Sequence, residues 1–209
     1  MKTLVIIDMQ NDFIPGGALA VPEGDQIVTL INKLQEEFDL VIATQDWHPL
    51  DHSSFAANHP GKNEFEKIEL HKQEQVLWPV HCVQNSFGAE FHPDLNSAKF
   101  EAIFRKGTAK EIDSYSAFYD NAHLKSTGLA GYLKEKGTEE LYFCGLAAEY
   151  CVYFSVMDAL KEGFSAILIE DATRPIDVED FQKEKENILK AGGKIIKSKE
   201  LISRLKKFL

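Results

Sequence analysis

The sequence predicts an α/β fold, with three α/β/α layers around a central, mostly parallel six-stranded sheet. Two observations support this prediction. Short apolar runs rich in β-branched residues recur along the 209-residue chain, which is typical of strands buried on both faces of a sheet. Patterns with helical spacing lie between several of these runs, and strands that alternate with helices form parallel sheets.

Each predicted element corresponds to one of these patterns. The strands are expected at residues 3–8, 40–44, 101–106, 140–145, 165–171 and 194–197. The helices are expected at residues 25–37, 149–162, 177–190 and 198–207. In the first helix, Ile27, Leu30, Ile31 and Leu34 share one stripe. The strand ends should then meet at one edge of the sheet, where ligand sites of such folds lie.

The interval 45–99 does not follow this alternation. It is rich in His, Pro, Asn and Gly and shows little periodicity. A loop of this length within a compact domain is usually functional or disordered. Its aromatic residues favour order. Because no repeat or linker interrupts the chain, we expect residues 1–209 to form a single domain, with a long functional loop region around 45–99.

Composition excludes several classes of protein. The formal net charge of −10 argues against binding to nucleic acid or to an anionic membrane. No apolar run reaches the ~18 residues that a membrane span needs, and the opening MKTLVIIDMQ does not read as a secretory leader. Three cysteines do not make a disulfide framework, so a reducing cytoplasm is predicted. A homo-oligomer is compatible with the sequence.

Three polar residues stand where predicted strands end or a helix begins. Asp8 ends the first strand, Lys106 ends another, and Cys151 lies in the first turn of a helix after the small residues of GLAA. A helix N-terminus stabilises anions, so we expect it to make the thiol of Cys151 more acidic. A nucleophile, a carboxylate and a cation at one sheet edge indicate covalent acyl transfer.

Each of these residues also has an ordinary interpretation. Asp8 could cap a loop, Lys106 could be a solvated surface group, and Cys151 could be a buried structural cysteine. We prefer the structural interpretation for Cys82 and Cys144.

A second constellation lies in the loop region. In DWHPLDHSSF (46–55), Asp46 and His48 are two residues apart, so their side chains point the same way in an extended segment. The segment WPVHC (78–82) offers His81 as a third ligand. One carboxylate and two imidazoles suit Zn, Fe or Mn, with water completing the coordination. His52 is either a fourth ligand or a residue that contacts the ligands without binding the metal itself.

Together these segments identify a family. The sequence resembles the nicotinamidases, also called pyrazinamidases, of the isochorismatase-like cysteine hydrolases, whose fold is Rossmann-like. The pair DWHP and WPVHC is the most specific part of the resemblance and separates nicotinamidases from metal-free relatives. The matching segments are VIIDMQNDFIPGGALAV (5–21), TQDWHPLDHSSFAANHPGK (44–62), LWPVHCVQNSFGAEFH (77–92), FRKGT (104–108), DSYSAF (113–118) and GLAAEYCV (145–152).

The resemblance implies a catalytic apparatus. The family's Asp–Lys–Cys triad maps onto Asp8, Lys106 and Cys151. Its oxyanion hole maps onto the backbone N–H groups of Ala147 and Cys151, with a cis peptide bond between Leu146 and Ala147.

The resemblance also implies the binding groups. The metal ligands map onto Asp46, His48 and His81, and in some members a histidine at the place of His52 also binds the metal. The walls of the ring pocket map onto Phe13, Trp78 and Tyr115. Tyr150 departs from the pattern, because some members have a histidine just before the nucleophile.

The implied activity is hydrolysis of nicotinamide to nicotinic acid and ammonia, and of pyrazinamide to pyrazinoic acid. The enzyme would be an amidohydrolase of a linear carboxamide C–N bond, acting through a cysteine thioester in NAD salvage. One divalent metal ion, Zn with Fe or Mn as alternatives, would bind the pyridine nitrogen. The rival interpretations are a related cysteine amidohydrolase for a carbamoyl or other small amide, and a non-catalytic ligand-binding protein.

Overall fold

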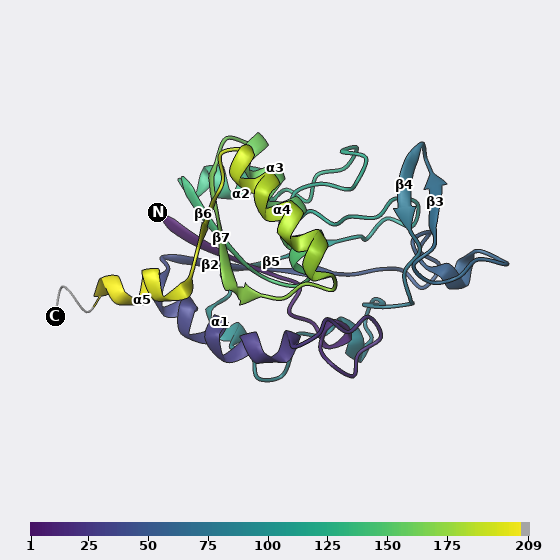
Figure 1. Cartoon of the computed structure of the whole chain (residues 1–209), viewed down its shortest axis with the longest axis horizontal. Helices are drawn as coiled ribbons and strands as arrows, with labels where there is room; N and C mark the ends of the chain where they lie inside the picture. Colours follow the sequence, from purple (N-terminus) through teal and green to yellow (C-terminus); the bar gives the residue numbers. More distant parts are fainter. Residues whose placement is uncertain (206–209) are drawn as a thin grey trace.

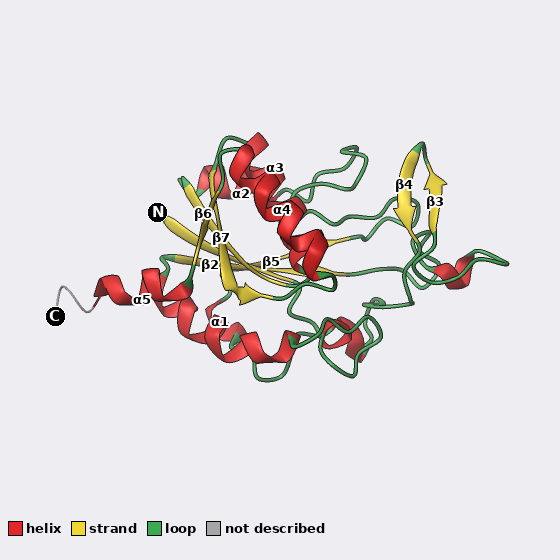
Figure 2. Cartoon of the chain, viewed as in Figure 1, coloured by secondary structure: helices red, strands yellow, loops and turns green. Residues whose placement is uncertain are grey.

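The computed structural model describes residues 1–205 and places a six-stranded sheet at the centre of the molecule (Figures 1 and 2). All neighbouring strands are parallel, in the order β5-β2-β1-β6-β7-β8. The six predicted strands are confirmed, and the sheet is parallel throughout. Its strands are β1 (Lys2–Ile7), β2 (Leu40–Asp46), β5 (Ala102–Lys106), β6 (Glu140–Gly145), β7 (Ser165–Thr173) and β8 (Lys194–Ile196).

The strand order reverses at the centre of this sheet. The chain winds outward from β1 through β2 to β5, then crosses to β6 on the other side of β1 and winds outward again. The loops after β1 and β6 therefore leave in opposite directions, and the crevice between them is where folds of this type bind ligands. Asp8 follows β1 directly, and Cys151 lies six residues after the end of β6.

Helices cover both faces of the sheet and form the three predicted layers (Figure 1). Helices α1 and α5 lie on one face, and α2, α3 and α4 lie on the other. Alternate residues of the central strand enter different cores, with Ile6 on the α1 side and Ile7 on the α3 side. The bounds are α1 (Val28–Leu34), α2 (Leu129–Glu135), α3 (Tyr153–Lys161), α4 (Val178–Lys190) and α5 (Ser198–Leu205).

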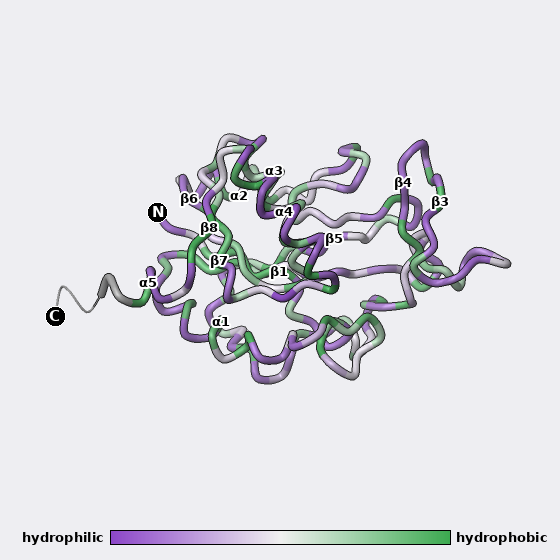
Figure 3. Tube along the Cα trace, in the orientation of Figure 1, coloured by the Kyte–Doolittle hydropathy of each residue, from purple (hydrophilic) through white to green (hydrophobic). Residues whose placement is uncertain are grey.

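The hydropathy of the chain agrees with this layering. Figure 3 shows hydrophobic residues along the central strands, whereas hydrophilic and hydrophobic positions alternate along α1 and α4. Such helices bury one stripe and expose the other. Within the described part of the chain, none of the helices has the length and apolar character that crossing a bilayer requires.

The predicted helices are recovered with local changes. The helix expected at 25–37 is an α-helix flanked by two 3₁₀ turns, and the one expected at 149–162 begins as a π-helical turn, Ala148–Val152. The prediction for 177–190 is confirmed by α4, and the last two positions of 198–207 lie outside the described residues. The 3₁₀ turns are Asn11–Phe13, Gly24–Ile27, Gln35–Glu37, Ala56–Asn58, Phe87–Ala89 and Ser97–Lys99.

Besides the 3₁₀ turns that lie outside the predicted helices, a short helix and a hairpin were not predicted. One is α2, which has only seven residues. The other is an antiparallel hairpin in the long loop region, formed by β3 (Lys67–Leu70) and β4 (Gln73–Val76). Its turn places His71 and Lys72 at positive φ, which usually calls for Gly or Asn, so no turn motif marks it in the sequence.

Candidate active site and metal centre

The carboxyl ends of three neighbouring strands bring charged groups together. Lys106, the last residue of β5, pairs in register with Asp46 at the end of β2, and Asp8 follows β1 beside them. The Lys106 ammonium forms an ion pair with Asp46 and lies 2.8 Å from Asp8 Oδ2. The same nitrogen lies 3.3 Å from the Sγ of Cys151. The structure thus places the three expected triad residues in one buried cluster and joins that cluster to Asp46.

Neighbouring side chains fix both carboxylates. The Thr44 hydroxyl donates a hydrogen bond of 2.6 Å to Oδ1 of Asp8, which leaves Oδ2 directed at Lys106. The Gln10 amide group holds the backbone of Asp46 from both sides, with two hydrogen bonds of 2.8 Å. Sequence reasoning missed both roles, because each depends on a contact across 36 residues of chain.

Burial and the shared cation give the two carboxyl groups opposite properties. Burial raises the pKa of Asp8 above its usual value, and Lys106 only partly opposes this. Burial acts in the same direction on Asp46, but Lys106 and His48 outweigh it and hold the pKa of Asp46 well below its usual value. Asp8 is therefore the better proton acceptor, and Asp46 is the permanent anion.

The electrostatics of Cys151 differ from the expectation. Burial raises the pKa of the Cys151 thiol well above its usual value, and Lys106 lowers it only in part. Our expectation that the helix start makes this thiol acidic is therefore wrong in its net direction, because desolvation dominates and the carboxylates of Asp8 and Asp46 add to it. The direction of this shift favours the neutral form of the Cys151 thiol.

The direction of the pKa shift of Cys151 can be tested by spectroscopy. We expect the ultraviolet absorbance of thiolate, measured as wild type minus Cys151→Ser, to be absent at pH 7 and to rise only above pH ~8.5, where an ordinary thiol ionises. The difference isolates Cys151 from the buried thiols of Cys82 and Cys144. A thiolate signal already complete at pH 7 would show that the helix start overcomes burial.

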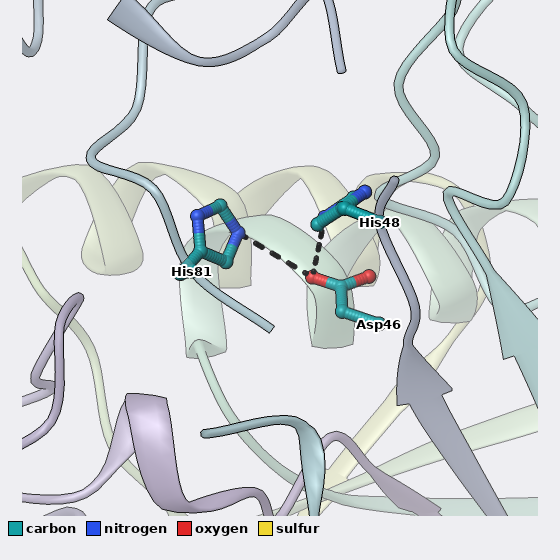
Figure 4. Close-up of side chains that lie close together, drawn as sticks. All are labelled: Asp46, His48 and His81. Carbon is teal, nitrogen blue, oxygen red and sulfur yellow. Dashed lines mark ion pairs between the residues drawn. The ribbon is translucent and has the colours of Figure 1, made fainter. Parts of the chain in front are cut away.

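A second cluster surrounds the other oxygen of Asp46 (Figure 4). The Nε2 atoms of His48 and His81 lie 3.5 and 3.8 Å from Asp46 Oδ2. Two ligands of a tetrahedral metal ion, each at about 2.1 Å from it, are about 3.4 Å apart. The spacing of these three side chains therefore fits a divalent cation.

Backbone carbonyl groups orient both imidazoles toward this point. The Nδ1 of His48 lies 2.9 Å from the carbonyl oxygen of Gly107, and that of His81 lies 2.8 Å from that of Pro79. Nδ1–H donates in each case, so the lone pair of Nε2 faces Asp46. The Nε2 of His48 is buried without a hydrogen-bond partner, as expected of a metal ligand.

Gly107 is required by this arrangement. Its φ is +61°, and a Cβ atom built there would lie 2.2 Å from the His48 ring. A larger residue would displace either the carbonyl group or the imidazole that it orients.

A cavity of about 340 Å³ opens in front of Cys151. Its apolar and aromatic walls are Phe13, Leu19, Trp78, Tyr115, Tyr150 and Ile176. Its polar lining is Asp46, His81, Asp113, Ala147 and Cys151. All three residues expected to bind the ring line this cavity, and so do the nucleophile and two of the expected metal ligands. Asp8 lies behind the wall and is fully buried.

Contacts among the aromatic walls, and one from outside the pocket, hold these walls in place. Trp78 Nε1 and Gln75 Nε2 both donate to the Tyr115 hydroxyl, at 3.2 and 3.3 Å, and Gln75 belongs to the unpredicted hairpin. Tyr150 packs edge-on against Trp78, with ring centroids 4.9 Å apart. The Leu146–Ala147 peptide bond is cis, as the resemblance implies.

Known proteins share both the fold and the length of this chain. The model of the Isochorismatase domain matches residues 2–200. A nicotinamidase from Acinetobacter baylyi is 46% identical over 200 residues, which are 95% of this chain and 94% of that protein. A solved nicotinamidase and pyrazinamidase from Acinetobacter baumanii superposes with a TM-score of 0.94 at 48% identity, over 96% of this chain and 97% of that chain.

A third similar protein was solved with a metal. The pyrazinamidase of Pyrococcus horikoshii in complex with zinc has a TM-score of 0.78 and 38% identity, over 94% of this chain and 98% of that chain.

Proposed function

The chain belongs to the isochorismatase family, and we propose that it is a nicotinamidase, which hydrolyses nicotinamide to nicotinic acid and ammonia. It is an amidohydrolase that cleaves a linear carboxamide C–N bond. One observation carries the proposal. A single cavity of about 340 Å³ is lined by the thiol of Cys151 and by two of the three residues that fit a divalent cation. The names of its relatives agree with this activity.

The aromatic walls and the metal centre orient the substrate. The pyridine ring lies among Phe13, Trp78 and Tyr115, which supply flat apolar surfaces. A divalent cation held by Asp46, His48 and His81 would supply a Lewis-acid acceptor for the pyridine nitrogen. We propose zinc for this site, with Fe or Mn as alternatives, and the zinc complex of the Pyrococcus relative supports this choice. Fixing the ring in this way presents the carboxamide to Cys151.

Proton transfer from Cys151 to Asp8 starts the reaction. The raised pKa of Asp8 makes it a better base than an ordinary carboxylate, and the Lys106 ammonium beside both groups stabilises the thiolate as it forms. The thiolate then attacks the amide carbon. The N–H groups of Ala147 and Cys151 stabilise the resulting oxyanion, each by an amount of ~3 kcal/mol.

Asp8 completes the cycle. Its proton passes to the departing ammonia, which leaves a nicotinoyl thioester on Cys151. Asp8 then takes a proton from water, whose oxygen attacks the thioester carbon. The C–S bond breaks and nicotinic acid is released, and the Cys151 thiolate takes the proton back from Asp8. Pyrazinamide carries the same carboxamide, and its N4 stands where the pyridine nitrogen of nicotinamide does, with one ring carbon between it and the carbon that bears the carboxamide. It therefore reacts in the same way. We place the enzyme in NAD salvage and in a reducing cytoplasm, where its three free cysteines remain thiols.

The test compares two amides that differ in one ring atom. Removing the metal should lower kcat/KM for nicotinamide at least tenfold, and added zinc should restore it, because the pyridine nitrogen loses its acceptor. Benzamide, which lacks that nitrogen, should be hydrolysed slowly and equally with and without metal. The measurement is ammonia release.

The other outcomes separate the rival functions. Release of ammonia from nicotinamide that survives metal removal would leave the thiol chemistry standing and contradict the role given to the metal. A folded, zinc-loaded enzyme that releases ammonia only from carbamoyl or other small amides would contradict the nicotinamidase proposal itself.

A further inference from the structure

His52 lies beside the metal centre but differs from its ligands in one respect. Its side chain is fully buried and packs against the His48 ring, with ring centroids 4.4 Å apart. The backbone N–H of Ser54 donates to its Nδ1 over 3.2 Å, and the Ser54 hydroxyl lies 2.7 Å from the same nitrogen. An Nδ1 that accepts a hydrogen bond carries the lone pair, so the proton of the neutral ring is on Nε2.

The proton on Nε2 prevents direct ligation through that atom. A metal ion needs an imidazole lone pair, and the one lone pair of His52 is already engaged by Ser54. In His48 and His81 the arrangement is the reverse, with Nδ1 facing a carbonyl oxygen. His52 also falls outside the group of Asp46, His48 and His81 whose ligand atoms lie within 4.8 Å of one another.

A second group shares His48 and points to a small polar ligand. One ring nitrogen each of His48 and His52 and one carboxylate oxygen of Asp113 lie within 4.8 Å of one another, and all three residues are buried. Within the described residues, the Nε2 atoms of His48 and His52 have no hydrogen-bond partner. A buried N–H without an acceptor costs about 1–3 kcal/mol, so the Nε2–H of His52 requires one.

Asp113 is fixed as the opposite partner. Its Oδ1 accepts from the Ser114 N–H at 2.7 Å, and its Oδ2 accepts from Gln75 at 3.2 Å. Each carboxylate oxygen has a further lone pair, so Asp113 can accept one more hydrogen bond. His52 thus offers a hydrogen-bond donor, and Asp113 offers an acceptor. A water molecule that ligates a metal can still accept one hydrogen bond and donate another, so it matches this pair.

We propose that His52 and Asp113 hold a water ligand of the metal, with His52 donating to its oxygen and Asp113 accepting its proton. This proposal rests on the metal site of the proposed function. The water would occupy one coordination position of the metal. Another position would stay open for the ring nitrogen of the substrate in the cavity, which Asp46 and His81 line. His52 and Asp113 are positioning residues, because they act on the metal through this water.

X-ray absorption of the zinc enzyme tests the coordination directly. The extended fine structure should count two imidazole ligands and additional oxygen ligands, and Asp113→Ala should keep the two imidazoles. A count of three imidazoles would make His52 a ligand and overturn the proposal. A protein that fails to bind zinc at all would contradict the metal site of the proposed function instead, so the two failures are distinguishable.

Metal affinity supplies a second readout that does not depend on turnover. We expect His52→Leu and Asp113→Ala to raise the dissociation constant for zinc about 10–100-fold, measured by competition with a chromophoric chelator. His52→Gln, which returns an N–H near the position of Nε2, should restore most of the affinity. Wild-type affinity in His52→Leu, or no rescue by His52→Gln, would overturn the proposal.

Matched controls exclude a general effect of the loop. His59 lies in the same loop, and its Nε2 lies 2.7 Å from the Ser53 carbonyl oxygen, so His59→Gln should bind zinc as the wild type does. The melting temperature of each metal-free variant should match that of the metal-free wild type within a few degrees. An equal loss of zinc affinity in His59→Gln would assign the effect to loop structure and overturn the proposal.

Discussion

Replacement of Cys151 by alanine is expected to lower turnover of nicotinamide by on the order of 10⁵-fold or more, which is the usual cost of losing a covalent nucleophile. The thioester cannot form without the thiol, and the remaining groups of the pocket only bind and polarise the amide. Mass spectrometry of quenched reactions should detect a nicotinoyl adduct on Cys151 in the wild type and none in the variant.

One of the two other cysteines, Cys144, supplies the matched control. Cys144 is fully buried in β6 and is not among the residues that line the cavity, so Cys144→Ala should keep the activity of the folded enzyme. Nicotinic acid should still bind to Cys151→Ala, since the metal ligands and the aromatic walls are intact. Positioning effects alone can lower activity about 100-fold. Residual activity above about one per cent in Cys151→Ala would therefore contradict the covalent mechanism.

Much of this site could be predicted from the sequence because a parallel sheet has only one edge of carboxyl ends. Once the apolar runs were assigned to strands, Asp8 and Lys106 had to approach the same edge, although 98 residues separate them. The spacing of Asp46 and His48 placed two possible ligands on one side of an extended segment. The segment WPVHC offered His81 as the third ligand, and the resemblance then supplied the pocket walls that spacing could not, such as Phe13 and Trp78.

The rest depends on distances that no local pattern encodes. Thr44 orients Asp8 through a hydroxyl in the middle of an apolar strand, where it reads as an ordinary β-branched residue. The carbonyl group of Gly107 orients His48, and a backbone group carries no signal in the sequence. The pKa of Cys151 followed the depth of burial rather than the helix start, and burial is a property of the assembled fold.

Lys106 connects the two halves of the site, and its loss should therefore affect stability as well as chemistry. Its ammonium contacts Asp8 and Cys151 on the catalytic side and Asp46 on the metal side. We expect Lys106→Met to lose most of its activity and about 3–5 kcal/mol of unfolding free energy, because removing one partner leaves buried charges uncompensated. Denaturant unfolding of the metal-free protein measures the second effect. Lys110→Met removes an exposed ion pair and should leave the unfolding midpoint unchanged.

The pH dependence of the unfolding free energy that Lys106→Met loses identifies the cause of that loss. Burial already raises the pKa of Asp8, and removal of Lys106 raises it further. A carboxyl group with a higher pKa in the folded protein binds more protons when folded, so its contribution to stability falls as pH rises above the unfolded value of about 3.9. The unfolding free energy of Lys106→Met should thus be slightly below that of the wild type at pH 4.5 and further below it at pH 7.5. An equal deficit at both values would mean that lost packing, and not uncompensated charge, destabilises the variant.

A double variant separates stability from catalysis at the same position. Asp8→Asn in the Lys106→Met background removes one of the two uncompensated carboxylates, so it should recover part of the lost unfolding free energy at pH 7.5. Activity should stay absent, because the base that accepts the thiol proton is gone. Recovered stability without activity would show that Lys106 has two roles. It stabilises the fold by neutralising Asp8 and Asp46, and it supports catalysis by keeping Asp8 ionised as a base. Recovery of activity in the double variant would contradict the role of Asp8.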